Sequence, residues 1–429
     1  MKEYKLKYGK TTQSVMLDEK KVLQVIDAPA GEKITDVKKA VLNAVRSPIK
    51  SAPLKDVVQK GDKVVILVSD ITRAWNRTCD FLPYVVEELN NAGVPDSDIS
   101  VLVAGGTHRA NTDEEKKIIV GADLFNRLKI YDHDAYDEAN NVYLGTTKRG
   151  TPVYVDRLAA EADKVILTGG ITPHLFAGFG GGRKSVVPGI ASDKTVNHNH
   201  VMALSDIPGG GINPETCLAK EWDNRVSEDM CEATSFLNPC FLVNSIVNAD
   251  GDFYAIVAGN WYEAWLEGTR IVKKQQGVKA LAKADIAITS GGGYPHDINL
   301  YQGMKAYVPA AMALKEGGVM IAVLECEDIA EPPVFFNSFH YDDLKEMEND
   351  VRHGFTIPFY VAFYTCCLAE RFTIILVTKP ENFEEARKTR AVPVATLEEA
   401  MEMAKKIVGK EDYTVNIFPH GMGTIPFFN

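Results

Sequence analysis

Short apolar runs that end in polar or glycine-rich turns constrain the fold of this chain more than any other feature. Residues 63–70, 100–108 and 163–170 each combine such a run with such a turn. Between the first two, apolar residues recur with helical spacing around residues 82–91. Strands that alternate with helices are typical of parallel sheets built from crossover units. We therefore predict an α/β fold in which helices flank a mostly parallel sheet.

A second pattern of the same kind begins after Gly277. Its predicted strands lie at residues 284–293, 317–325, 371–378 and 392–397, and a helix to Val408 follows the last of them. A chain of 429 residues is also longer than a single core usually supports. The sequence therefore predicts two α/β domains.

The predicted domain boundary lies near residues 270–280, within a basic helix around residues 271–281. We expect an N-terminal domain of residues 1–275, to which residues 412–429 could be added, and a C-terminal domain of residues 276–411. The active site is expected in the cleft between the two domains.

Composition excludes several classes of function. The formal net charge of −11 argues against nucleic-acid binding as the main activity. No apolar run reaches the ~20 residues of a membrane span, and the N-terminus lacks the apolar core of a secretory signal. The seven cysteines lack the spacing of zinc or thioredoxin-type motifs. We expect the adjacent Cys366 and Cys367, in an apolar stretch, to be buried thiols, and the compartment to be reducing. We predict a cytoplasmic protein.

Polar side chains follow three of the predicted N-terminal strands at the point where each strand ends. Asp70 and Arg73 follow the first strand, His108 follows the second, and His174 follows the third. Ligands of open parallel sheets bind outside the carboxyl ends of the strands. These side chains are therefore expected to share one crevice.

Residues 177–185 contain three consecutive glycines followed by Arg183 and Lys184. Glycines let backbone N–H groups approach an anion, which predicts a loop that cradles a phosphate. The loop departs from the P-loop of nucleotide triphosphatases, because Arg183 occupies the place of the second required glycine. A nucleotide triphosphatase is therefore not favoured.

Taken together, these residues resemble the nickel-dependent lactate racemase family and its relatives. The run from His174 to Thr195, followed by His200, is similar to a long signature of that family. Further motifs match in the same order, namely Asp70-x-x-Arg73, Gly-Thr-His108-Arg, and Gly293-Tyr-Pro-His-Asp-Ile-Asn-Leu-Tyr301-Gln302-x-x-Lys305. The likeness covers nearly the whole chain.

The resemblance implies a nickel-pincer nucleotide, a pyridinium-3-thioamide-5-thiocarboxylic acid mononucleotide that holds Ni through sulfur, carbon and sulfur. Lys184 would be its covalent tether, His200 the fourth nickel ligand, and Asp70 and Arg73 further cofactor contacts. Nickel favours soft or nitrogen donors, yet no cysteine pair is placed to bind it, so the cofactor would bring the sulfur. Cofactor maturation proteins would be partners of the chain, and a chain made without them would lack the cofactor.

The reaction implied by the resemblance is racemisation or epimerisation of a 2-hydroxycarboxylic acid by reversible hydride transfer to the cofactor. His108 and His174 would be the two general bases, one for each orientation of the hydroxyl group. Arg73 would hold substrate oxygen atoms. The substrate carboxylate would be bound by Gln302 and Lys305, whose i, i+3 spacing puts them on one helix face, with Tyr301 beside them.

Two departures from the lactate enzyme concern the substrate side chain. Trp75 and Arg77 lie in a segment where that enzyme has proline-rich sequence, and residues 356–361 lack its pocket tryptophan. We predict a 2-hydroxyacid larger than lactate, with an apolar side chain on Phe359 or Trp75 or a polar one reaching Arg77 or His296. The other histidines are expected at the surface or in loops: His133, His340, His353 and His420.

Three alternatives stay open at this point. The chain could be a lactate racemase itself. It could instead be a zinc hydrolase that uses His108, His174 and His200, although this leaves Lys184 and the glycines unexplained. The third alternative is a non-catalytic binding protein with the same fold.

Overall fold

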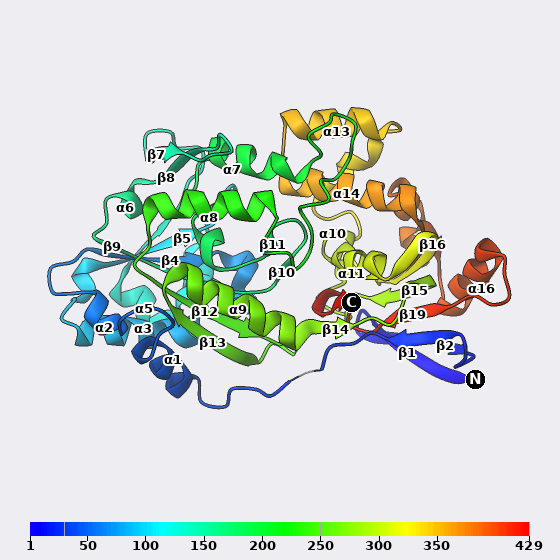
Figure 1. Cartoon of the computed structure of the whole chain (residues 1–429), viewed down its shortest axis with the longest axis horizontal. Coiled ribbons are helices and arrows are strands. Elements are labelled where there is room, and N and C mark those ends of the chain that lie inside the picture. Colours follow the sequence, from blue (N-terminus) through cyan, green and yellow to red (C-terminus); the bar gives the residue numbers. More distant parts are fainter. Residues whose placement is uncertain (30, 249, 429) are drawn as a thin grey trace. The chain divides into compact units, whose positions relative to one another are not determined.

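The structure, a computed structural model, describes residues 1–29, 31–248 and 250–428. The chain divides into two compact units (Figure 1). We call them the central unit, residues 30–202 and 215–275, and the terminal unit, residues 1–29, 203–214 and 276–429. No described helix has the length and apolar character that a membrane crossing requires.

A six-stranded sheet with the order β13-β12-β9-β4-β5-β6 forms the middle of the central unit. Its strands are β4 (Val64–Ser69), β5 (Ile99–Ala104), β6 (Lys129–Asp132), β9 (Lys164–Gly170), β12 (Phe241–Val247) and β13 (Phe253–Gly259). All neighbours are parallel except β12 and β13, which are antiparallel. The predicted α/β class is confirmed.

Helices cover the sheet of the central unit. The longer ones are α1 (Val37–Arg46), α3 (Thr78–Asn91), α4 (Asp113–Val120), α7 (Asp193–His200), α8 (Arg225–Leu237) and α9 (Trp261–Gln276), and the short ones are α2 (Leu54–Val57), α5 (Ala122–Arg127) and α6 (Arg157–Ala160). Two hairpins complete the unit, β7 (Asn141–Thr146) with β8 (Pro152–Asp156) and β10 (Pro173–His174) with β11 (Gly178–Phe179). The predicted amphipathic helix is α3, which buries Leu82, Val85 and Leu89 against the sheet.

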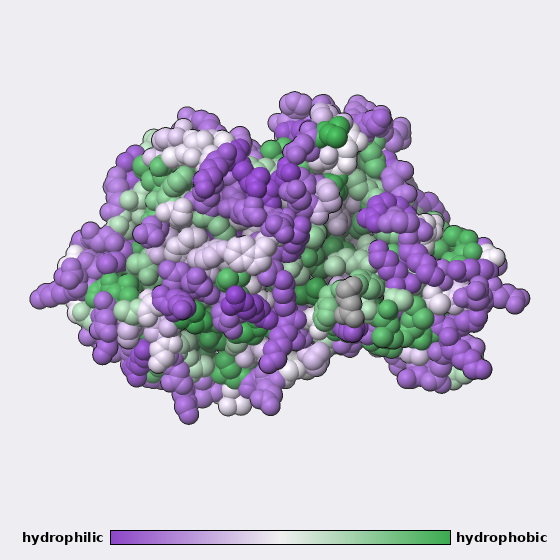
Figure 2. Space-filling model, viewed as in Figure 1, coloured by the Kyte–Doolittle hydropathy of each residue, from purple (hydrophilic) through white to green (hydrophobic). Residues whose placement is uncertain are grey.

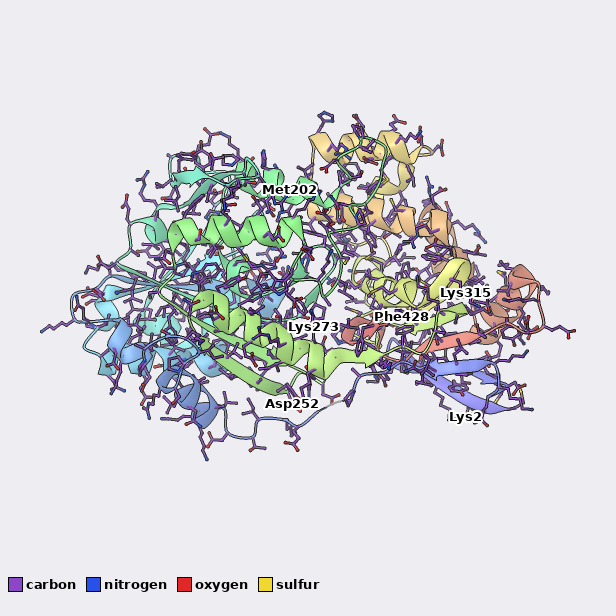
Figure 3. All side chains as sticks on the ribbon, in the orientation of Figure 1. Lys2, Met202, Asp252, Lys273, Lys315 and Phe428 are labelled. Atoms are coloured by element: carbon purple, nitrogen blue, oxygen red, sulfur yellow. The ribbon has the colours of Figure 1, made fainter. Side chains whose placement is uncertain are left out.

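A six-stranded parallel sheet with the order β18-β17-β16-β15-β19-β3 forms the middle of the terminal unit. Its strands are β3 (Val22–Val25), β15 (Ala284–Ser290), β16 (Leu314–Val323), β17 (Thr373–Val377), β18 (Val392–Val394) and β19 (Val415–Phe418). Lys315, labelled in Figure 3, lies at the start of β16 and contacts Asp285 of β15 at 3.0 Å. This ion pair joins neighbouring strands where both begin.

The other elements of the terminal unit cover that sheet or lie at its edges. They are the hairpin β1 (Lys2–Tyr8) and β2 (Thr11–Leu17), the pair β14 (Gly277–Lys279) and β20 (Ile425–Phe427), and the helices α10 (Leu300–Gly303), α11 (Tyr307–Met312), α12 (Pro333–Phe336), α13 (Leu344–His353), α14 (Ile357–Arg371), α15 (Phe383–Lys388) and α16 (Leu397–Val408). Apolar residues of β1, β2 and α16 pack on the sheet in one core. The face of the molecule seen in Figure 2 is mainly hydrophilic.

The division into units differs from the predicted one at both chain ends. Residues 1–29 group with the terminal unit, because β3 pairs with β19. Residues 412–429 also group with that unit, since β19 pairs with β15. The predicted basic helix ends at Gln276 rather than near residue 281, and β14 follows it.

Candidate functional site

The three strands that the sequence singled out are direct neighbours in the sheet of the central unit. β4 lies between β5 and β9, and all three are parallel. The chain passes from β4 to β5 and β6 on one side, and β9 is then added on the other side of β4. The reversal of strand order between β4 and β9 is a topological switch point, where open α/β sheets bind ligands.

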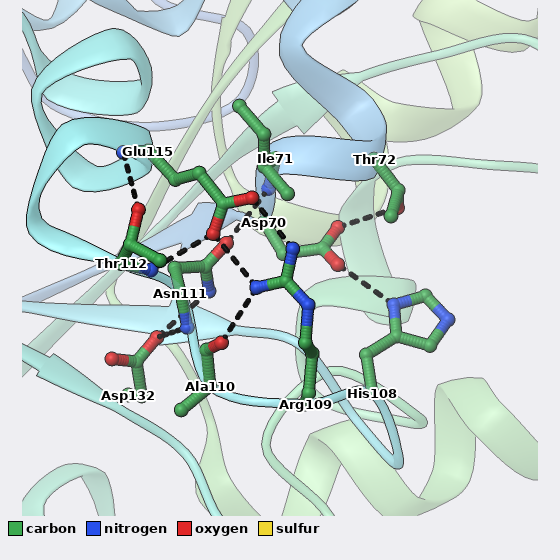
Figure 4. A network of polar contacts seen from close by, with 10 residues as sticks. All are labelled: Asp70, Ile71, Thr72, His108, Arg109, Ala110, Asn111, Thr112, Glu115 and Asp132. Carbon is green, nitrogen blue, oxygen red and sulfur yellow. Dashed lines mark hydrogen bonds and ion pairs between the residues drawn. The ribbon is translucent and has the colours of Figure 1, made fainter.

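Asp70 and His108 form a hydrogen-bonded pair at this edge (Figure 4). His108 Nδ1 lies 2.7 Å from Asp70 Oδ2, and Thr72 Oγ1 donates to the other carboxylate oxygen at 2.8 Å. Burial alone would raise the pKa of Asp70, but the hydrogen bonds from His108 and Thr72 and the charge of Arg73 hold it below its usual value. An ionised Asp70 keeps the proton of His108 on Nδ1, so Nε2 is the nitrogen that can act as a base.

The loop that carries His108 is held by contacts on both sides (Figure 4). Asn111 accepts a hydrogen bond from Ile71 N at 3.1 Å and donates to Asp132 Oδ1 at 2.7 Å. Arg109 makes a bidentate ion pair with the Glu115 carboxylate, with N···O distances of 2.8 and 2.6 Å. These contacts attach the loop to the end of β4, to β6 and to α4, and so fix the orientation of the His108 ring.

His174 and Lys184 form a second pair. Lys184 Nζ lies 2.7 Å from His174 Nε2, and Ala177 N donates to His174 Nδ1 at 3.3 Å. Burial, together with the charge of Arg73, lowers the pKa of His174 well below its usual value. A neutral imidazole that accepts at Nδ1 carries its proton on Nε2. That proton is then donated to Lys184, which can accept it only as a neutral amine.

The charge environment of Lys184 also favours the neutral amine. Burial and the charges of Arg73 and Arg183 lower the pKa of Lys184 well below its usual value. Arg183 is fully buried, and burial lowers its pKa to about 10. Within the described part of the chain, the Arg183 guanidinium donates to Ala177 O, Phe179 O and Ser227 Oγ at 2.7 to 3.0 Å, and to no carboxylate. Positive charge therefore accumulates around Lys184.

The glycines before Lys184 serve close packing, which corrects the predicted phosphate cradle. A Cβ at Gly178 would lie 2.1 Å from Lys220 O, and one at Gly182 would lie 2.7 Å from the Trp265 ring. The N–H groups of Gly180 and Gly182 already donate within the protein, to Thr172 O at 2.7 Å and Asn244 Oδ1 at 2.8 Å. The segment that follows, Gly182–Ser185, is one short 3₁₀ turn.

His200 lies fully buried at the end of α7. Burial is the main cause that lowers its pKa to about 3, so the imidazole is neutral and suits a metal as a nitrogen ligand. The Phe176 ring lies 4.7 Å from the His174 ring and 5.2 Å from the His200 ring. His174, Lys184 and His200 thus belong to one cluster.

Two residues that sequence reasoning missed hold the helix of His200. Asn199 donates to buried Asp229 at 2.8 Å, and Asp229 also accepts hydrogen bonds from Thr147 and Thr151. Phe176 was missed as well, although it lies within the recognised motif. A polar residue next to His200 was the only sequence signal for the Asn199 contact.

The three predicted substrate-binding residues belong to the terminal unit. Asn299 caps α10 by accepting from Gln302 N at 2.9 Å, and Lys305 Nζ contacts Gln302 Oε1. The predicted common face of Gln302 and Lys305 is confirmed. The Tyr301 ring packs 5.3 Å from that of Phe335.

One expectation about a single residue, Arg77, is corrected. The Arg77 guanidinium donates to Asp80 at 2.7 Å and to Gly251 O at 3.2 Å and lies over the Phe253 ring, so these structural contacts occupy it. His133 lies in a loop directly after β6, as predicted, and is buried there. Its ring nitrogens contact Asp156 Oδ2 and Ala191 O at 3.0 Å each.

The zinc-hydrolase alternative is not favoured by the arrangement of side chains. Across residues 1–29, 31–248 and 250–428, no three histidine, cysteine or acidic side chains gather in a way that could hold a metal ion. Nitrogens of His108 and His174 are instead directed to Asp70 and Lys184.

Comparison with known proteins gives matches over almost the full chain. Residues 8–209 match the lactate racemase N-terminal domain, and residues 279–426 match the lactate racemase C-terminal domain. The chain is 30% identical over 432 residues to a lactate racemase of Thermoanaerobacterium thermosaccharolyticum, covering 99% of each. It is 30% identical over 429 residues to a lactate racemase of Lactiplantibacillus plantarum, covering 98% of each.

Solved structures give the same result. The lactate racemase apoprotein from T. thermosaccharolyticum superposes with a TM-score of 0.89 at 29% identity, over 99% of this chain and 100% of that one. A Thermotoga maritima protein superposes with a TM-score of 0.61 at 18% identity, over 92% of this chain and 97% of that one, which is a likeness of fold. The chain therefore belongs to the lactate racemase family of isomerases.

Proposed function

We propose that this chain racemises or epimerises a 2-hydroxycarboxylic acid with the help of a nickel-pincer nucleotide. The observation that carries the proposal is that two histidine pairs, His108 with Asp70 and His174 with Lys184, follow strands of one sheet at the same edge. Two histidines from different strand ends suit a reaction that handles both configurations of one carbon atom.

The residues of the central unit fit an anionic cofactor that carries nickel. Arg73 and Arg183 bring positive charge to the surroundings of Lys184, which suits a nucleotide phosphate and an acidic sulfur-bearing arm. Neutral His200 is a suitable nitrogen ligand for nickel. The absence of a three-residue ligand cluster among the described side chains agrees with a cofactor that supplies the other donor atoms.

Lys184 is suited to become the covalent tether. A neutral amine is a nucleophile, whereas an ammonium is not. Its contact with His174 Nε2 and the neighbouring guanidinium groups both favour the neutral form. Acylation of Lys184 would remove the lone pair that accepts the His174 proton, and so would release His174 from this contact.

The protein residues would manage protons and orientation. When bound, the cofactor would accept the α-hydrogen together with its electron pair and return it. His108 Nε2 would take the hydroxyl proton of one enantiomer and His174 that of the other. Arg73 would hold substrate oxygen atoms. We assign Asp70 to the orientation of His108, in place of the predicted cofactor contact.

The terminal unit would supply carboxylate binding. Lys305 brings a positive charge and Gln302 an amide N–H, and their mutual contact holds both in one place. Tyr301 would pack beside them. Cofactor maturation proteins are proposed as partners, because the tether needs a finished cofactor.

Metal analysis combined with the mass of the intact chain tests this proposal. We expect nickel, together with a mass increase on the chain, after coexpression with the maturation proteins. Zinc without a mass increase would support the hydrolase, and a chain with neither would be a binding protein. Either result would contradict the proposed function.

The substrate is expected to be larger than lactate. Trp75 lies over Gly170, at the end of β9, where a Cβ would be 3.1 Å from the indole ring, and the Phe359 ring stacks on Tyr341. When two substrates differ by one methylene group that the pocket buries, their kcat/KM values differ by about 10- to 200-fold. We expect a longer 2-hydroxyacid to exceed lactate in kcat/KM by about 10-fold or more in a panel of aliphatic, aromatic, acidic and polyhydroxy substrates. A panel in which lactate is the best substrate would contradict this expectation.

A further inference from the structure

The sheet of the terminal unit has a topological switch point of its own. The chain passes from β15 to β16, β17 and β18 on one side, and β19 is then added on the other side of β15. All the strands are parallel, so the carboxyl ends of β15 and β19 lie side by side. Crevices outside such strand ends are where open α/β sheets bind ligands.

Two histidines lie at this switch point. Gly292 follows β15 with a φ of +101°, and a side chain there would begin 3.7 Å from His296 Cδ2 and 3.8 Å from His420 Cδ2. His296 belongs to the loop after β15, and His420 follows β19. The glycine therefore leaves space between two imidazole rings that come from neighbouring strand ends.

A third strand end orients one of these rings. Asp27 follows β3, the neighbour of β19, and its carboxylate oxygens lie 3.1 and 3.4 Å from His420 Nδ1. This contact keeps a proton on Nδ1 and so fixes the orientation of the ring. The pair has the same chemistry as Asp70 with His108 in the central unit.

Lysine side chains add positive charge around the two rings. Lys7 lies along the same turn, with its Cβ 3.1 Å from the position of a Gly293 Cβ. Burial and the charges of Lys305, Lys7 and His420 lower the pKa of His296, whereas Asp297 opposes them. An anion in this place would offset that repulsion.

The carboxylates of Asp297 and Glu325, which lie near these histidines in the sequence or the fold, make contacts with other groups. Asp297 Oδ2 accepts from Gly9 N at 2.7 Å and from Glu325 N at 3.2 Å. Glu325 is paired with Lys379 at 3.4 Å. Asp297 and Glu325 therefore contact the backbone and a lysine, and Asp27 contacts only Nδ1 of His420 among the two rings. The ring edges beside Gly292 are left for an anion.

We propose that His296 and His420 bind a second acidic group of the substrate, so that the substrate is a 2-hydroxydicarboxylic acid. This inference rests on the proposed function, because the first carboxylate is assigned to Gln302 and Lys305 of the same unit. Of the two polar candidates for the substrate side chain, Arg77 is occupied by Asp80 and Gly251. His296 therefore remains as the polar residue that would contact the substrate side chain. His420, whose ring also lies beside Gly292, would bind the same acidic group.

Matched substrate pairs test the inference with matured enzyme. Malate and 2-hydroxybutyrate differ in the replacement of a carboxylate by a methyl group, as do 2-hydroxyglutarate and 2-hydroxyvalerate. A contact with a charged group is worth about 10- to 100-fold, so we expect kcat/KM to favour the diacid in at least one pair by that factor. His296→Ala and His420→Ala should each remove most of this preference, because they lower kcat/KM for the diacid far more than for the monoacid.

Two further variants distinguish a direct contact from a loss of structure. His296→Lys retains a positive charge and should retain most of the preference for the diacid. His340→Ala removes an exposed histidine of the same unit, whose Nδ1 contacts Asn337 O, and should change nothing. Equal losses on diacid and monoacid in the two alanine variants, or no preference in the unaltered enzyme, would overturn the inference. A preference for polyhydroxy acids over diacids would overturn it as well.

A binding measurement on the unmodified chain separates this inference from the proposed function. Calorimetric titration with malate and with 2-hydroxybutyrate requires no cofactor. Diacid binding that is weakened in His296→Ala and His420→Ala would support the anion site even if matured protein turned over no 2-hydroxyacid, in which case the proposed function would fail. Turnover of 2-hydroxyacids without histidine-dependent diacid binding would refute the anion site alone.

Discussion

Replacement of Lys184 by alanine is expected to abolish covalent retention of the cofactor and to leave the fold intact. The amine is the only part of the residue assigned to the attachment, and alanine has no nucleophile to replace it. The backbone contact of Lys184 N with Gly181 O at 3.1 Å does not depend on the side chain. Arg183, which anchors the same turn from the buried side, is unchanged.

The measurement is the mass of the intact chain after coexpression with the maturation proteins. Lys194→Ala is the matched control, because Lys194 is an exposed lysine on α7 that pairs with Glu138 at 2.6 Å. We expect the control to carry the full adduct and Lys184→Ala to carry none. Circular dichroism and thermal unfolding would show that both variants are folded. An adduct that persists in Lys184→Ala would refute the tether.

The strand ends of the central unit could be predicted because local patterns specify them. An apolar run followed by a polar turn identifies a strand and its carboxyl end without reference to the rest of the chain. Asp70, His108 and His174 were placed in this way. The common face of Gln302 and Lys305 followed from helical spacing alone, because residues three apart lie on the same side of a helix.

Contacts between distant segments could not be predicted from the same patterns. The pairing of Asp70 with His108 depends on the orientation of two loops, and no local signal gives it. The addition of β3 to the sheet of the terminal unit brings residues 22–25 beside residues 415–418. No local pattern in residues 22–25 names that partner. For this reason residues 1–29 group with the terminal unit, whereas the predicted N-terminal domain covered residues 1–275.

Charged and glycine-rich segments were also ambiguous in the sequence. A run of glycines permits close approach either to an anion or to neighbouring protein, and the sequence alone does not distinguish the two. The structure brings Lys220 and Trp265 against Gly178 and Gly182, so packing accounts for them. A buried Arg183 was equally unexpected, because arginine is rarely buried without an acidic partner.

Removal of either proposed base is expected to stop racemisation while the cofactor remains attached. His108→Ala and His174→Ala should each lower kcat by about 10²- to 10⁴-fold, which is the usual cost of removing a general base. Both directions should be affected in each variant, because the reaction of each enantiomer ends at the base that starts the reaction of the other. The adduct mass and the nickel content should match those of unaltered enzyme.

Rates measured separately from each pure enantiomer decide between two bases and one. His353→Ala is the control, since His353 is exposed on α13 and its Nδ1 contacts a backbone carbonyl at 2.7 Å. Asp70→Asn should lower kcat and retain the cofactor, because an amide no longer holds the proton of His108 on Nδ1. His174→Ala leaves the Asp70–His108 pair untouched, so its loss of rate would be independent of that contact. If either histidine variant racemised at the unaltered rate, the remaining histidine would be serving both configurations, and the two-base mechanism would have to be abandoned.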